Sequence, residues 1–292
     1  MNEIVYLNGL FIPKEEAKIS PDDRGFNFAD GIYEVVKYYS GKPFMWEEHL
    51  RRLERSLNET GIAFNETGNL QEIASELLNM NGLSEKNAGL YLQITRGSHK
   101  RVHHFPENLQ PTVYATAFEM NSFINKLREG IKVISHEDIR WLRCDIKSVS
   151  LLPNTMLYNK AVLQGADECI LIRNGSVTEA THSSVFGIRN GSLVTHPLSN
   201  LILPGITRIA IMDICSKNHI PVNETPIGVN EVLNLDELFI SGTGSEIMPV
   251  VRVDESTLGE GIPGPVTRII QRSFFERTYR ALGNENCWWD WD

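Results

Sequence analysis

The sequence predicts an α+β fold made of two lobes. Segments with a strand pattern and segments with a helix pattern alternate along the chain, and the series starts again after a polar stretch near residue 120. The length of 292 residues suits one large domain or two domains of moderate size. We therefore expect a smaller N-terminal α/β domain at 1–120, a larger C-terminal domain at 121–282 and a tryptophan-rich tail at 283–292.

The first series begins with turn signals and continues with amphipathic helices. Asn8-Gly9 lies between two apolar runs, and Ser40-Gly41 interrupts a run of β-branched and aromatic residues. Leucines then repeat on one face of a segment that ends in glycine, which indicates a helix. The elements expected are hairpins at 4–12 and 32–46, helices at 47–61 and 70–82, and strands at 89–97 and 111–119.

The second series contains further hairpins and three helices. Asn-Gly pairs divide two strand-like stretches, and Pro153 is tolerated because it falls in the first turn of its helix. Gly205 precedes another helix and Pro221 follows it. The series begins with IKVISHEDIRWL from 131, and the elements expected are hairpins at 168–180 and 183–196, two short strands within 237–254, and helices at 151–166, 206–219 and 265–282.

The composition argues against several classes of protein. The formal net charge is −9 and no long lysine or arginine run occurs, so nucleic acid is not an expected partner. No stretch approaches the roughly 18 apolar residues of a membrane helix, and the start of the chain lacks a signal-peptide pattern. The four cysteines form no C-x-x-C pair, which favours a reduced, cytoplasmic protein over a disulfide framework or structural zinc.

Lys147 is the first candidate for chemistry. It lies in IRWLRCDIKS, among apolar residues and close in sequence to Arg140 and Arg143. An unprotonated lysine can form a Schiff base with a carbonyl, and neighbouring cations favour the neutral amine, whereas Asp145 opposes it. On spacing alone a surface or structural lysine is the more common outcome.

Two glycine-containing segments are candidates for binding phosphate. Gly205-Ile206-Thr207 opens a predicted helix, whose free N–H groups and dipole attract anions. Gly242-Thr243-Gly244-Ser245 is a turn that offers further donors. Neither segment fits the P-loop or the dinucleotide-binding pattern, and most glycine-rich turns are only turns.

Glu179 and the loop around Arg101 are candidates for polar recognition. A carboxylate between apolar strands is unfavourable unless it is paired, and a protonated ring nitrogen would be a suitable partner for Glu179. The alternative is that Glu179 lies at the end of a strand and faces water. Arg101, His103 and His104 follow one another closely in KRVHHF, and arginine binds carboxylates through two parallel hydrogen bonds. A metal site is not expected because no third ligand is indicated, and a solvated loop remains the simplest interpretation.

Taken together, these segments resemble one family. The sequence resembles the fold-type IV pyridoxal-phosphate enzymes, and within them the D-amino-acid aminotransferases, from about residue 3 to about residue 280. Several independent motifs in order are far more specific than any one of them. The motifs, in family order, are DRGFNFADGIYEVVK, RCDIKSVSLLPN, VTEATHSSVFG, LPGITR and SGTGSEIMPV.

The resemblance implies pyridoxal 5′-phosphate in the cleft between the two lobes, held mainly by the C-terminal domain. Lys147 would be the Schiff-base lysine and the proton shuttle. Glu179 would face the pyridine nitrogen and keep it protonated, which preserves the ring as an electron sink. Arg52 would hold the cofactor phosphate. The remaining implied contacts are the Ile206 backbone N–H, Thr207 and Thr243 at the phosphate, and Leu203 on the ring face away from the lysine.

The resemblance also implies the reaction and the assembly. Tyr33, Arg101 and His103 would bind the α-carboxylate of a D-amino acid such as D-alanine, with a 2-oxo acid such as 2-oxoglutarate as the second substrate. The loop with this arginine and histidine reaches in from a neighbouring subunit in the family, so a homodimer is implied. Branched-chain L-aminotransferases and aminodeoxychorismate lyases share the lysine, glutamate and phosphate motifs, but they are not expected to carry the R-x-H loop together with the YEVVK tyrosine segment. An inactive cofactor-binding module is a further alternative.

Three features depart from the family pattern or from simple spacing. Arg52 lies about 200° around its helix from Leu50, so spacing alone predicts a solvated side chain. His182 stands where the family has a small hydroxyl residue, and Ser184 stands where it has asparagine. The tail at 283–292 has no counterpart in the family pattern, and we expect it to be disordered or loosely packed.

Overall fold

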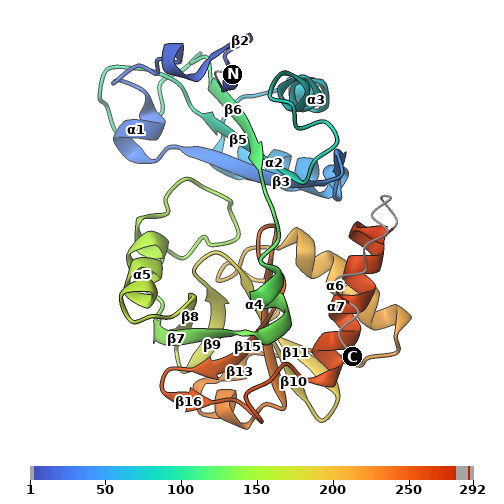
Figure 1. Ribbon diagram of the computed structural model, residues 1–292. Helices are drawn as coiled ribbons and strands as arrows, with labels where there is room; N and C mark the ends of the chain where they lie inside the picture. Colours follow the sequence, from blue (N-terminus) through green and yellow to red (C-terminus); the bar gives the residue numbers. More distant parts are fainter. Residues whose placement is uncertain (1–2, 281–288, 290–292) are drawn as a thin grey trace. The chain divides into compact units, whose positions relative to one another are not determined.

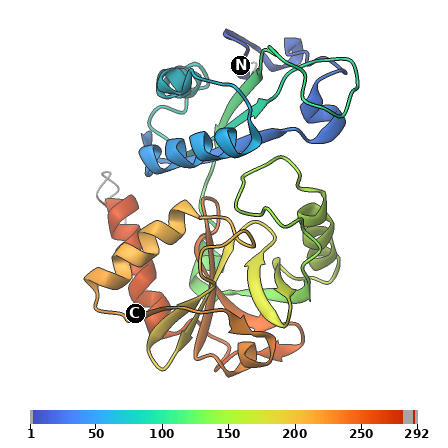
Figure 2. The same ribbon diagram turned by 180° about the vertical axis from the view of Figure 1, so that it is seen from behind.

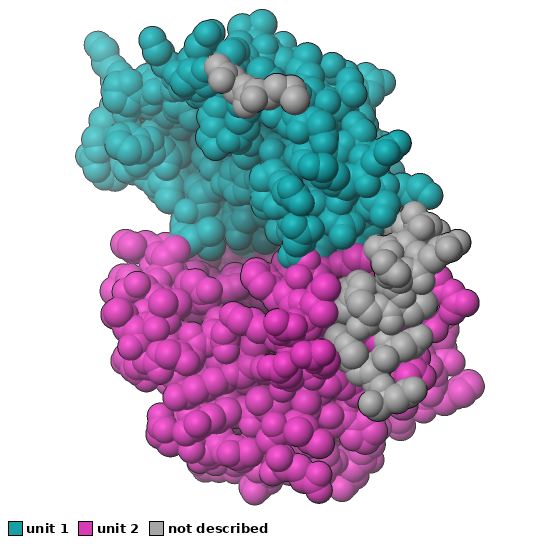
Figure 3. Space-filling view, viewed as in Figure 1, with its two compact units in different colours: residues 1–121, 146–151 teal, residues 122–145, 152–292 magenta. Residues whose placement is uncertain are grey.

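The computed structural model describes residues 3–280 and residue 289, and it contains two compact units (Figures 1, 2 and 3). Unit 1 comprises residues 1–121 with 146–151, and unit 2 comprises residues 122–145 with 152–292. The chain therefore enters unit 1 a second time in the segment that carries Lys147. The sequence predicted a single division at residue 120, and it did not predict this return to unit 1.

Unit 1 is an antiparallel sheet with helices packed on it. The strands lie in the order β2-β1-β6-β5-β3-β4, α2 packs on β3, and α3 packs on β1 and β6. Leucine and isoleucine side chains of the sheet and of both helices form the core. The bounds are β1 Ile4–Leu7, β2 Leu10–Pro13, η1 Lys14–Glu16, α1 Arg24–Phe28, β3 Gly31–Tyr39, β4 Lys42–Pro43, α2 Trp46–Thr60, η2 Thr67–Asn69, α3 Leu70–Met80, β5 Ala88–Thr95 and β6 Thr112–Glu119.

Unit 2 is built on a mixed sheet. The strands lie in the order β12-β11-β10-β14-β15-β7-β8-β9-β13, and β16 pairs with β15. The bounds of the strands are β7 Ile131–Glu137, β8 Glu168–Arg173, β9 Ser176–Ala180, β10 Ser184–Arg189, β11 Ser192–Thr195, β12 Val222–Glu224, β13 Ile227–Gly228, β14 Glu237–Gly242, β15 Glu246–Val253 and β16 Ser256–Thr257. The helices are α4 Ile124–Glu129, α5 Leu152–Leu163, α6 Ile206–Lys217, η3 Val229–Asn234 and α7 Pro265–Thr278.

The hairpins predicted from Asn-Gly and Ser-Gly pairs are confirmed. Asn8, Ser40, Asn174 and Asn190 all have positive φ, as do the glycines that follow them. A two-residue turn with positive φ at both positions matches the twist of the strands it joins, and asparagine and glycine adopt it at low cost. These turns connect β1 to β2, β3 to β4, β8 to β9 and β10 to β11.

The parallel pairing in unit 2 was not predicted. β7 pairs in parallel with both β15 and β8, and both of these strands lie far from β7 along the chain. Parallel strands need a crossover connection, and the one between β7 and β8 contains α5. The same connection contains the segment 146–151, so the crossover delivers Lys147 to unit 1.

The tail lies mostly outside the described residues, apart from Trp289. Its side chain is 3% exposed, and its ring centre lies 5.9 Å from that of Phe275 and 5.6 Å from that of Tyr279. Loose packing is therefore wrong for Trp289, because the end of α7 offers an aromatic surface. The described helices include none with the length and apolar character to cross a bilayer.

Candidate active site

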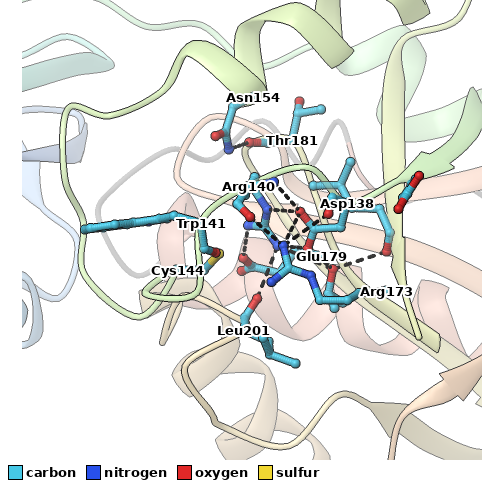
Figure 4. Close-up of polar contacts among 12 residues, drawn as sticks. Asp138, Arg140, Trp141, Cys144, Asn154, Arg173, Glu179, Thr181 and Leu201 are labelled. Carbon is cyan, nitrogen blue, oxygen red and sulfur yellow. Dashed lines mark hydrogen bonds and ion pairs between the residues drawn. The ribbon is translucent and has the colours of Figure 1, made fainter. Parts of the chain in front are cut away.

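Glu179 is buried and paired in unit 2. It lies on β9 and is 5% exposed, so the alternative of a strand-end residue in water is wrong. Its Oε1 accepts a hydrogen bond from the Leu203 backbone N–H at 2.9 Å. Its Oε2 accepts one from Arg140 Nη1 at 2.6 Å (Figure 4). Two candidate residues, Glu179 and Leu203, are thus brought together.

Arg140 is a partner of Glu179 that the sequence did not reveal. It donates from Nε and Nη2 to the two oxygens of Asp138, both at 2.9 Å, while Nη1 binds Glu179. Thr178 donates to Asp138 Oδ2 at 2.9 Å, and Arg173 Nη2 lies 3.1 Å from Asp138 Oδ1. The sequence placed Arg140 only near Lys147; its position two residues after an aspartate is a weak signal, and a contact 39 residues away is needed to identify the role.

Burial and pairing act in opposite directions on the charges of this network. Burial raises the pKa of Glu179, and the nearby Asp138 adds to that, so the attraction of Arg140 only partly offsets the rise. Burial would lower the pKa of Arg140, but the two carboxylates outweigh burial and leave it raised. Arg140 divides its attraction between Glu179 and Asp138, whereas both carboxylates act on Arg140. Glu179 accepts a short hydrogen bond from Arg140 and a second one from the Leu203 N–H, which are the contacts typical of an ionised carboxylate.

Three segments of unit 2 meet where the sequence placed a phosphate site. A Cβ on Gly205 would lie 3.0 Å from Ser184 Oγ, and a Cβ on Gly242 would lie 3.0 Å from Ser245 Oγ and 3.3 Å from Ser183 Oγ. The hydroxyls of Ser183 and Ser245 are 3.1 Å apart. Segments 181–184, 205–207 and 242–245 therefore form one cradle, called here the hydroxyl cradle, which contains Ile206, Thr207 and Thr243.

The hydroxyl cradle has the chemistry of an anion site. Gly205 is the N-cap of α6 and has no side chain to cap the helix, so the N–H groups of the first turn are suited to an outside acceptor. Thr207 is buried on the first turn, and glycine at 205 and 242 keeps the backbone open. These features fit a phosphate group.

His182 belongs to the first segment of the hydroxyl cradle, but its ring contacts Glu168 and Tyr158. Its Nδ1 is 2.9 Å from Glu168 Oε2, and its ring centre is 5.1 Å from that of Tyr158 on α5. Glu168 is 1% exposed, and His182, together with Thr181, helps to lower its pKa against burial. The His182 side chain itself is 58% exposed. The histidine thus pairs with a buried carboxylate, and the second departure, Ser184, contributes its hydroxyl at Gly205.

In unit 1, Lys147 lies beside Tyr33. The Lys147 carbonyl accepts from the Tyr33 backbone N–H at 3.0 Å, and Lys147 Nζ is 4.3 Å from the centre of the Tyr33 ring. The Lys147 backbone N–H donates to Ser56 Oγ of α2 at 3.3 Å. The segment is therefore fixed between β3 and α2, and two more candidate residues are brought together.

Arg52 is buried, so the prediction of a solvated side chain is wrong. It is 7% exposed and donates from Nε and Nη2 to the two oxygens of Glu34, at 2.7 and 2.8 Å. The buried face of α2 contains His49, Arg52, Leu53, Ser56 and Leu57, whereas Leu50 is only partly buried. Counting leucines alone misplaced this face, because it also carries the polar partners of Glu34.

Arg101 and His103 lie together in the exposed loop between β5 and β6. The guanidinium carbon of Arg101 is 4.8 Å from the centre of the Phe28 ring, and the His103 ring centre is 5.5 Å from it. Tyr33, the third candidate for the substrate carboxylate, lies on β3 with its ring stacked at 5.8 Å on Tyr91. Across residues 3–280 and 289, no group of three or more histidine, cysteine, aspartate or glutamate side chains is placed to hold a metal ion.

Comparison with known proteins identifies close relatives. The sequence model of the family described as "Amino-transferase class IV" matches residues 31–253. A D-alanine aminotransferase of Bacillus licheniformis is 40% identical over 269 residues, which is 91% of this chain and 94% of that protein. A D-alanine aminotransferase of Staphylococcus haemolyticus is 42% identical over 272 residues, covering 92% of this chain and 96% of the relative.

Solved structures share the fold. The branched-chain amino acid aminotransferase of Escherichia coli superposes with a TM-score of 0.90 at 26% identity and covers 99% of this chain and 98% of its own. A branched-chain aminotransferase of Thermoproteus uzoniensis has a TM-score of 0.87 at 26% identity, covering 100% of this chain and 98% of its own.

Proposed function

The chain belongs to the class IV aminotransferases, and we propose that it transfers an amino group between a D-amino acid, such as D-alanine, and a 2-oxo acid, such as 2-oxoglutarate. The observation that carries the proposal is the buried Glu179 carboxylate, which two donors orient in the same unit as the hydroxyl cradle. Relatives named D-alanine aminotransferase, at 40 and 42% identity over most of the chain, support the choice of a D-amino acid.

Pyridoxal 5′-phosphate is the proposed cofactor. Lys147 would hold it covalently, Glu179 would accept a hydrogen bond from its ring nitrogen, and Arg52 would contact its phosphate. Its other proposed contacts are Leu203 at the ring and Ile206, Thr207 and Thr243 at the phosphate, all in or beside the hydroxyl cradle. When bound, the cofactor supplies an electron sink for the electrons left on the α-carbon.

Lys147 is the proposed acid–base group. Its Nζ would take the α-proton and later return it, so it must alternate between amine and ammonium. The centre of the Tyr33 ring lies 4.3 Å from Nζ, and an aromatic face attracts a cation at this distance. Tyr33 would therefore help to hold the lysine side chain in place.

The α-carboxylate of the substrate is the proposed ligand of Tyr33, Arg101 and His103. The position of the carboxylate would decide whether the single α-hydrogen of a D- or of an L-amino acid faces Lys147, and this contact would determine the preference for one enantiomer. We propose that Arg101 and His103 serve the site of a neighbouring subunit in a homodimer. A cytoplasmic location is proposed as well, and it fits the buried free thiols of Cys144, Cys169 and Cys215.

A branched-chain L-amino-acid aminotransferase is the second candidate function. The specific observation in its favour is the likeness to the Escherichia coli enzyme, with a TM-score of 0.90 at 26% identity. The higher identity to D-alanine aminotransferases favours the first candidate. Substrate tests separate the two.

The test is a visible absorption spectrum of the purified holoenzyme, recorded with D-alanine or with L-leucine, and paired with steady-state transamination assays. We expect D-alanine to bleach the cofactor band and L-leucine to leave it unchanged. Lys147→Ala should abolish turnover with an unchanged circular dichroism spectrum, whereas Lys160→Ala, which changes an exposed lysine on α5, should leave turnover intact. Bleaching by L-leucine only would favour the second candidate, and steady-state turnover by the Lys147 variant would contradict the role of that lysine.

A further inference from the structure

The Phe28 ring contacts two of the three residues proposed to hold the substrate carboxylate, Arg101 and His103. Phe28 is the last residue of α1, and its ring centre is 4.8 Å from the guanidinium carbon of Arg101 and 5.5 Å from the ring centre of His103. The arginine lies over the ring, and the histidine meets it edge-on at an interplanar angle of 61°. Both geometries are favourable for an aromatic face.

The helix that carries Phe28 is firmly attached to the sheet. Asp23, the N-cap of α1, is 1% exposed and accepts a hydrogen bond from the Gly25 backbone N–H at 2.8 Å. The same carboxylate accepts from Thr95 Oγ1 at 3.0 Å and from Thr112 Oγ1 at 2.6 Å, at the ends of β5 and β6. These strands are the two that the Arg101 loop connects, so Phe28 and the base of the loop share one fixed support.

The loop itself is attached at the residue between Arg101 and His103. Arg24, which is 2% exposed, donates from Nη1 to the Val102 carbonyl at 2.7 Å and from Nε to Asp30 at 2.7 Å. Its guanidinium carbon also lies 4.7 Å from the centre of the Phe28 ring. The backbone at Val102 and the side chains on both sides of it are thus oriented by α1.

We propose that Phe28 is a positioning residue that sets the orientation of Arg101 and His103 and thereby determines the affinity for the substrate α-carboxylate. This inference rests on the proposed function. An exposed arginine has many rotamers, and a clamp that is ordered before substrate binds loses less entropy when it binds. Phe28 takes no part in proton transfer, so its effect belongs to KM and not to kcat.

The experiment replaces the ring while keeping an apolar side chain. Phe28→Leu should raise the KM for D-alanine by about two- to fivefold, the range expected for loss of an exposed cation–π contact and an edge contact, with kcat nearly unchanged. Because every substrate offers the same α-carboxylate, the KM values for D-glutamate and 2-oxoglutarate should rise by the same factor. Phe28→Tyr keeps the ring and should restore the wild-type KM.

Two control variants make the result specific. Phe105→Leu removes an exposed aromatic ring of the Arg101 loop itself, whose centre lies 3.6 Å from the guanidinium carbon of Arg96, and it should leave KM unchanged. Arg101→Ala should raise KM more than Phe28→Leu does. Calorimetric titration of the holoenzyme with propionate, a simple carboxylate that is not turned over, should show weaker binding for both the Phe28→Leu and the Arg101→Ala enzymes.

The outcomes separate this inference from the proposed function. If Arg101→Ala raises KM but Phe28→Leu does not, the positioning role is overturned and the loop keeps its assignment. If Phe28→Leu and Phe105→Leu raise KM equally and lower Tm equally, general loop damage explains both and the inference fails. If D-alanine is a substrate but Arg101→Ala leaves KM unchanged, the carboxylate lies elsewhere and this inference falls with the loop assignment.

Discussion

Glu34 and His49 show how burial and pairing set the charge of single side chains in unit 1. Both are nearly inaccessible, and His49 Nδ1 lies 2.8 Å from Glu34 Oε2. Burial would raise the pKa of Glu34, but Arg52 and His49 outweigh it and hold the pKa well below its usual range. Burial lowers the pKa of His49, and the pairing with Glu34 offsets that only in part.

These two lowered pKa values predict that unit 1 loses stability in acid. Both groups have a lower pKa in the folded state, so the unfolded chain binds more protons as the pH falls, and the free energy of unfolding decreases. The contribution of His49 is lost as the pH falls below its unfolded pKa of about 6.5. The contribution of Glu34 is lost at lower pH, below its unfolded pKa of about 4.5.

His49→Gln should therefore flatten the pH dependence of stability between about pH 7 and pH 5. The measurement is urea unfolding at several pH values, followed by circular dichroism. His104→Gln, which changes an exposed histidine, should retain the wild-type slope. An identical slope in wild type and in His49→Gln would show that His49 is not the group that titrates.

At the scale of elements, glycine is required where the chain closes the Arg101 loop. Gly97 has a φ of +97°, and a Cβ there would lie 2.0 Å from the Gln110 carbonyl oxygen. Gly9 has a similar φ of +93°, but no described atom lies within 4 Å of its Cβ position. The two glycines thus share the backbone conformation and differ in the space around them.

Gly97→Ala should destabilise the protein more than Gly9→Ala. The first change adds a backbone clash to the unfavourable conformation and should lower the free energy of unfolding by roughly 2–4 kcal/mol. The second should cost only about 1 kcal/mol for the conformation. Urea unfolding measures both. Because the clash falls at the base of the loop, we also expect a higher KM for D-alanine in Gly97→Ala only; equal stability losses would argue against the close approach.

At the scale of the whole molecule, the end of the chain contributes to the core of unit 2. Trp289 is 3% exposed and contacts Phe275 and Tyr279, and the Tyr279 hydroxyl donates to Glu246 Oε1 at 3.1 Å. Glu246 directly follows the turn 242–245 of the hydroxyl cradle. The aromatic cluster at the end of α7 therefore supports the strand that leaves the cradle.

Trp289→Ala should lower the free energy of unfolding by up to about 3–5 kcal/mol, as expected for removal of a large buried aromatic side chain. Trp141→Ala, which changes a side chain that is 44% exposed, should shift it by much less. Chemical unfolding of both variants, monitored by circular dichroism, is the measurement. A loss for Trp289→Ala no larger than that of Trp141→Ala would show that the tail does not stabilise the fold.

The sequence by itself determined the α+β class, the hairpins at Asn8, Ser40, Asn174 and Asn190, and membership of the aminotransferase family. These features depend on local turn chemistry, on hydrophobic period and on motifs in order, all of which are written along the chain. The roles proposed for Lys147 and the other site residues stay predictions.

Only the tertiary structure decided which charges are buried and what they pair with. Arg52 lies inside unit 1 on Glu34, Arg140 holds Glu179 and Asp138, and the segment 146–151 returns to unit 1. Sequence spacing reports which residues share a face of one element. It does not report which distant carboxylate meets a guanidinium, because the packing of the elements decides that partner. Burying a charge is unfavourable unless a partner compensates it, so the pairing forms only in the folded protein.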